Sequence, residues 1–192
     1  MPKHGRREPS FPNIIAICVL AALAMPAAAQ SLGKNVPKIC AQLLKEGWTA
    51  PADPLTHKRG KAEMNLPGVM YICMAEHVLP TKGDGHAPDL QALLSKDTEA
   101  SVILSANVWC EVDQAETLDA LAKQVERSLA VANIKVPDSV LAAIRAAKET
   151  KISADGLSFG VLPIFVDPDA CSRVPADELG AVLMKVDVSV KE

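Results

Sequence analysis

Apolar residues recur along this chain with two spacings, one typical of strands and one typical of helices. The clearest strand pattern is the alternation of apolar residues with mostly polar neighbours over 101–112, which predicts a long half-buried strand. The same period of two recurs over 157–165 and over 182–190. Pro163 lies inside the first of these two runs, so we expect an edge strand or a bulge there. Together these runs predict three strands that each bury one face.

A β-hairpin is predicted earlier in the chain. Residues 62–66 alternate between apolar and polar, and residues 69–75 are almost continuously apolar. The Pro-Gly pair between the two runs is typical of a turn. A loop rich in Gly and Pro follows over 79–89, and we expect a short helix over 89–95.

Helical spacing of apolar residues predicts three longer helices, over 37–47, 113–129 and 138–147. Pro37 suits the first turn of the first helix, because its fixed φ matches the helix and its missing N–H would be unpaired there anyway. The residues before it, 30–36, are expected to form a short flexible lead.

The order of these elements is helix, hairpin, strand, two helices and two strands. Adjacent antiparallel strands need helices to cover their apolar side. We therefore predict an α+β fold, with an antiparallel sheet of about five strands and helices packed mainly on one face.

The N-terminus has the layout of a secretory signal peptide. Three basic residues among the first seven precede an apolar run over 14–25, and the small residues 27–29 follow. This pattern predicts cleavage between Ala29 and Gln30. The run is shorter than the roughly 20 apolar residues that a spanning helix needs. We predict that 1–29 are removed and that 30–192 form a single α+β domain in the periplasm or outside the cell; an uncleaved anchor is the alternative.

Composition narrows the class of protein. Hydrophobic residues make up 49% and charged residues 22% of the chain, as in an ordinary globular protein. The net charge of −3 argues against nucleic-acid binding, which requires a basic face. After the predicted signal, no apolar run approaches the length of a membrane span.

Four cysteines remain after the predicted cleavage: Cys40, Cys73, Cys110 and Cys171. An even number in an exported protein favours two disulfides, with three possible pairings. We predict Cys40–Cys73, because the first helix should pack on the hairpin. We also predict Cys110–Cys171, because Cys110 lies near the end of one strand and Cys171 follows another in a short loop. The alternative is that all four are buried thiols. The chain has no C-x-x-C, so neither a thioredoxin-like site nor a paired-cysteine zinc site is supported.

Residues 156–160 match the pattern G-x-S-x-G, which in α/β-hydrolases places a nucleophilic serine on a strand-to-helix turn. Here the residues that follow Ser158 have a strand pattern, and the last histidine of the chain is His86. We therefore predict that Ser158 is an ordinary strand residue and that no catalytic residue can be named.

Two further groups of residues are candidate binding sites. His77, Asp84, His86 and Asp89 lie at a strand end and in its loop, and histidine with carboxylate suits a zinc ion. The spacing matches no metal motif, so a solvated loop is the alternative and no metal or other cofactor is predicted.

The second group is a possible contact surface. Lys58, Arg59 and Lys61 form a basic run in a Pro-rich loop, which could contact a partner or could simply be solvated. Trp48 and Trp109 are the chain's two tryptophans, and such residues are common at interfaces, although burial under a helix is the alternative.

These patterns favour a soluble, exported and non-catalytic binding or assembly protein of the cell envelope, with another envelope protein as its partner. The alternative is a metal-dependent binder or small enzyme that uses the loop from His77 to Asp89.

Overall fold

The computed structural model describes residues 27–190, apart from Pro54, Val69 and the segments 81–86, 97–99, 109–113 and 166–181. The helices of this part are α1 (Ala27–Lys45), α2 (Gln114–Ala130) and α3 (Asp138–Arg145). The strands are β1 (Glu63–Leu66), β2 (Met70–Val78), β3 (Asp89–Lys96), β4 (Ala100–Val108), β5 (Thr150–Ala154), β6 (Leu157–Phe165) and β7 (Val182–Val190). Among the described helices, none is long and apolar enough to cross a membrane.

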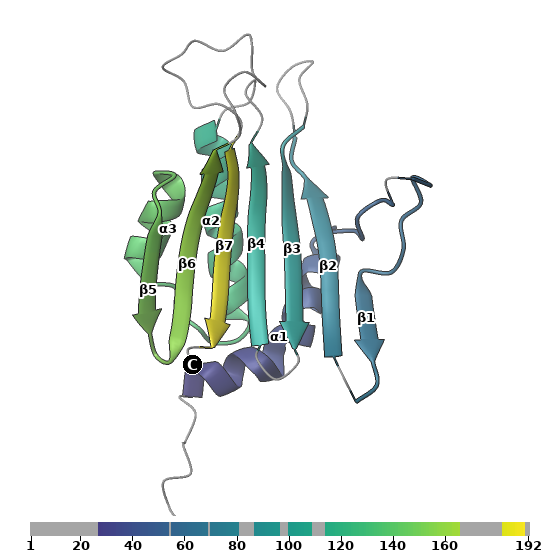
Figure 1. Cartoon of the computed structure of the whole chain (residues 1–192), viewed down its shortest axis with the longest axis horizontal. Helices are drawn as coiled ribbons and strands as arrows, with labels where there is room; N and C mark the ends of the chain where they lie inside the picture. The colour runs from purple at the N-terminus through teal and green to yellow at the C-terminus, as the bar shows by residue number, and fades with distance from the viewer. Residues whose placement is uncertain are drawn as a thin grey trace, which may run out of the picture.

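The strands form one open antiparallel sheet in the order β1-β2-β3-β4-β7-β6-β5 (Figure 1). The predicted α+β class with an antiparallel sheet is confirmed. The predicted number of about five strands is wrong, because the described part of the chain contains seven. The last strand in chain order, β7, lies between β4 and β6 and joins the two halves of the sheet.

The three helices lie behind the sheet as it is viewed in Figure 1. Helix α1 packs on β2, β3 and β4, α2 packs on β4, and α3 packs on β5 and β6. Alternate strand residues point toward the helices and are buried; they are Cys73, Ala75, Leu90, Ala92, Leu94, Val102, Leu104, Ala106, Leu157, Phe159, Val161, Met184, Val186 and Val188. Burial of this aliphatic layer against the helices is the main stabilising contribution to the fold.

The segment predicted as a short helix over 89–95 is strand β3. Its residues pair with β2 on one side and with β4 on the other. Leu90 and Leu94 are buried, whereas Leu93 is exposed. Because Leu93 is apolar but exposed, the sequence of this segment lacks the alternation of apolar and polar residues that indicates a strand. Pairing with a strand on each side favours the extended conformation over the local helix preference.

Strand β5 is an addition to the predicted elements. It pairs with β6 through a two-residue turn, in which Asp155 and Gly156 both have positive φ. An Asp-Gly pair between two alternating runs is a strong hairpin signal. The sequence therefore contained the evidence for this strand.

Helix α1 begins before the position that Pro37 indicated. The predicted flexible lead over 30–36 is helical, and Leu32 and Val36 within it are fully buried. The apolar stripe that Ile39 and Leu43 continue therefore extends across the proline. Pro37 lacks the N–H that would bond one turn earlier, but the burial of this stripe outweighs that loss.

The predicted disulfide between Cys40 and Cys73 is present. It joins α1 to β2, with 6.1 Å between the two Cα atoms. Both cysteines are fully buried. Cys110 and Cys171 lie outside the described residues, so their pairing remains a prediction.

Candidate functional site

The face of the sheet that points away from the helices is exposed over several strands. We call this surface the open face. Several large apolar side chains on it are more than 40% exposed, among them Met74, Leu93, Leu162 and Ile164. Single exposed apolar residues are common on protein surfaces, but a group of them on one side of a sheet is typical of a binding surface.

A row of serines crosses the open face. Five adjacent strands each place one serine in register with the next: Ser95, Ser101, Ser189, Ser158 and Ser153. The hydroxyls of Ser95 and Ser101 are hydrogen-bonded at 2.8 Å. Neighbouring strands lie about 4.8 Å apart, so the row presents hydroxyls at a regular interval across the sheet.

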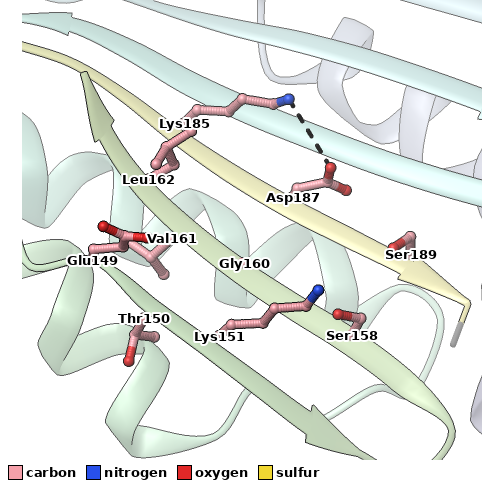
Figure 2. Close-up of a pocket in the computed structure, with 10 residues that line it drawn as sticks. All are labelled: Glu149, Thr150, Lys151, Ser158, Gly160, Val161, Leu162, Lys185, Asp187 and Ser189. Atoms are coloured by element: carbon pink, nitrogen blue, oxygen red, sulfur yellow. Dashed lines mark ion pairs between the residues drawn. The ribbon is translucent and has the colours of Figure 1, made fainter.

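A pocket of about 290 Å³ lies over β5, β6 and β7 on the open face. Gly160 occupies the middle of β6, between Lys151 of β5 and Asp187 of β7. Because Gly160 has no side chain, the surface is hollowed there. Ser158 and Ser189 line one end of the pocket and Lys185 lines the other (Figure 2).

Charges of both signs line this pocket. The ammonium of Lys185 lies 4.0 Å from Asp187 Oδ2, at the outer limit of an ion pair. The other carboxylate oxygen of Asp187, Oδ1, is buried and accepts no hydrogen bond from the described residues. Lys151 is exposed and forms no ion pair within the described part of the chain. The ammonium of Lys151 and the exposed part of the Asp187 carboxylate are therefore accessible for a further polar contact.

Ser158 lies in an extended strand, as predicted. It pairs with Ser153 on one side and with Ser189 on the other. No histidine is among the described residues that line its pocket. The strand-to-helix turn and the histidine that the G-x-S-x-G motif needs in an α/β-hydrolase are therefore not found around Ser158 in this part of the structure.

The residues proposed as a contact surface have different environments. Trp48 is only 3% exposed and stacks on His77, with 5.7 Å between the ring centroids, so it belongs to the core. Arg59 donates to Thr49 Oγ1 and to the Ala50 carbonyl, each at 2.7 Å.

Arg59 also forms an ion pair with Glu76 of β2. This residue therefore fastens the loop to the sheet. Lys58 and Lys61 are exposed, and Trp109 lies outside the described residues.

The same loop contains a tight turn. Asp53 Oδ1 accepts hydrogen bonds from the backbone N–H groups of Leu55, at 2.8 Å, and Thr56, at 3.3 Å. These bonds favour the ionised carboxylate and lower the pKa of Asp53, with the Leu55 bond as the largest cause. The turn leaves the Leu55 side chain almost fully exposed.

The metal-site candidates do not come together in the described part of the chain. His77 points toward the helices, where it stacks on Trp48. Asp89 is paired with Val78 and points to the open face, where it accepts hydrogen bonds from Asn107. These two side chains therefore lie on opposite faces of the sheet.

Asp84 and His86 lie outside the described residues. Among those that are described, no group of three or more His, Cys, Asp or Glu could hold a metal ion.

Comparisons with protein-family models, with curated proteins and with solved structures found no match to this chain.

Proposed function

We propose that this chain is an exported, non-catalytic binding protein of the cell envelope that contacts a partner protein through the open face of its sheet. One observation carries the proposal: helices cover one face of the sheet, whereas the other face exposes Met74, Leu93, Leu162 and Ile164. Exposing such side chains to water is unfavourable, and a partner that covers them would remove this cost.

The chemistry of the open face also fits a partner. Its apolar residues alternate with the serine row and with polar residues such as Gln91 and Asn107. An interface with scattered polar groups around apolar contacts is typical of partners that also exist free in solution. A purely apolar face would instead be typical of an obligate assembly.

Export is supported by two further features. The N-terminal charge and apolar pattern has the form of a signal peptide. The Cys40–Cys73 disulfide is compatible with an oxidising compartment.

Photocrosslinking in cells tests the binding face. Benzoylphenylalanine at Leu93 or at Leu162 should give a covalent adduct of one discrete mass, because both side chains project from the open face. The same group at Ala142, an exposed residue of α3, should give none. Adduct formation is read on denaturing gels and by mass spectrometry.

The captured protein is then purified and its affinity measured. Leu93→Asp should weaken binding at least tenfold, because it places a charge in the apolar contact, and Ala142→Asp should not. Equal adducts from both faces would contradict the proposed binding face. An adduct at twice the mass of this chain would contradict a partner of a different kind.

The site of processing is tested separately. N-terminal sequencing of the exported protein should give a first residue near Gln30. Cleavage there leaves Leu32 and Val36, the buried residues of the first turns of α1, in the mature chain. An intact Met1 on membrane-bound protein would contradict the prediction.

A further inference from the structure

Gly160 is an unusual residue for the middle of a paired strand. Glycine there destabilises a protein relative to alanine, because it has more conformational freedom to lose on folding. Three conditions within the fold itself can require it: a positive φ, a crowded backbone or a bulge.

None of these conditions holds at Gly160. It is not among the described glycines with positive φ. A Cβ placed on it would meet Asp187 at 3.9 Å, which is ordinary van der Waals contact. Its strand pairs in continuous register with β5 and with β7, so there is no bulge. The remaining reason for glycine in a strand is the close approach of another molecule.

The two neighbours of Gly160 have opposite charges. Lys151 is its partner in β5 and Asp187 is its partner in β7. Adjacent strands are about 4.8 Å apart, so the Cα atoms of Lys151 and Asp187 are about 10 Å apart, with the glycine between them. In Figure 2 the Lys151 side chain extends in the direction of Ser158, and the Asp187 carboxylate lies across β6 from Lys151, on the same face of the sheet.

We propose that the pocket over Gly160 binds a small zwitterion of the amino-acid or short-peptide class. The ligand's ammonium pairs with the exposed part of the Asp187 carboxylate, whose side chain is 41% exposed. Its carboxylate accepts from the ammonium of Lys151. The hydroxyls of Ser158 and Ser189 are placed to bond to the polar backbone of the ligand.

The size and charge of the pocket support this class of ligand. A volume of about 290 Å³ is at the lower end of the range for drug-sized ligands and suits a smaller molecule. Lys185 and Glu149 also line the pocket, so its four charged residues sum to zero. A neutral pair of opposite charges matches a zwitterion better than it matches a simple anion or cation.

Titration of the mature domain with glycylglycine, followed through backbone amide resonances, tests the proposal. Saturable shifts are expected for Gly160, Ser158 and Ser189. Acetate and ethylammonium, which each carry one of the two charges, should bind at least tenfold more weakly. Similar affinity for acetate or for ethylammonium, or no saturable shift with glycylglycine, would overturn the proposal.

Matched variants distinguish the pocket from the surface in general. Lys151→Gln and Asp187→Asn should each weaken glycylglycine at least tenfold, whereas Lys96→Gln, at an exposed end of β3, should not. Gly160→Val should abolish binding by filling the pocket, and it should fold because its Cβ meets no crowding. Gly60→Val, where a Cβ would enter open space, is the control.

Glycylglycine binding that survives Gly160→Val would place the site elsewhere and overturn the proposal. The inference goes beyond partner binding and does not depend on it. The crosslinking positions and the pocket are read by different assays, so either proposal can fail alone.

Discussion

Replacing Cys40 and Cys73 together by alanine should lower the free energy of unfolding by about 4 kcal/mol. The bridge joins residues 33 positions apart. Without it the unfolded chain gains conformational entropy, and for a loop of this length that gain stabilises the unfolded state by about 4 kcal/mol. Both positions are fully buried, so the lost sulfur contacts act in the same direction. Thermal unfolding of a domain of this size should then begin about 10 °C lower.

Reductant provides the control for this measurement. Dithiothreitol should destabilise the unmodified protein by more than it destabilises the Cys40→Ala, Cys73→Ala variant, in which only the predicted Cys110–Cys171 bridge can be reduced. Equal unfolding temperatures for the oxidised protein and the double variant would show that the bridge contributes nothing. Equal sensitivity of the two proteins to reductant would assign the effect to other cysteines.

Leu32→Ala should destabilise the protein by about 3 kcal/mol. Leu32 is fully buried in the second turn of α1, and its removal leaves a cavity among core side chains. Lys34→Ala, an exposed position of the same helix, should change stability by less than about 0.5 kcal/mol. Both values come from urea unfolding followed by circular dichroism.

If Leu32→Ala lowered the free energy of unfolding as little as Lys34→Ala, the start of α1 would contribute no packing in solution. In that case residues 30–36 would behave as the flexible lead that Pro37 suggests. The measurement therefore tells whether residues 30–36 form the flexible lead that Pro37 predicts or a helical turn that packs its apolar residues in the core.

Long elements with a regular pattern could be predicted from the sequence. Strands β6 and β7 match the predicted ranges, and α2 lies within one residue of its prediction at each end. The Cys40–Cys73 bridge also followed from the sequence, because a helix and a neighbouring hairpin pack together in such a fold. In each case the residues that decide the structure are close together in the chain or share one periodicity.

Features that depend on distant partners could not be predicted in this way. Strand β3 contains good helix formers, and only its two neighbouring strands make it extended. The pocket is a similar case, since Lys151 and Asp187 become neighbours of Gly160 only through the register of three strands. A glycine in the middle of an alternating strand was the one local signal of the site, within a motif that suggested a nucleophilic serine instead.

The position of β7 has a consequence for how the chain folds. Strands β1 to β4 form a meander of local pairs, and β5 to β7 form a second one. The two meanders meet only between β4 and β7, where Val102 is paired with Val188. Closing so long a loop costs more entropy than forming either meander, so we expect this pairing to form late. Until it does, the inner edges of β4 and β7 are both unpaired, and the chain is then most exposed to aggregation.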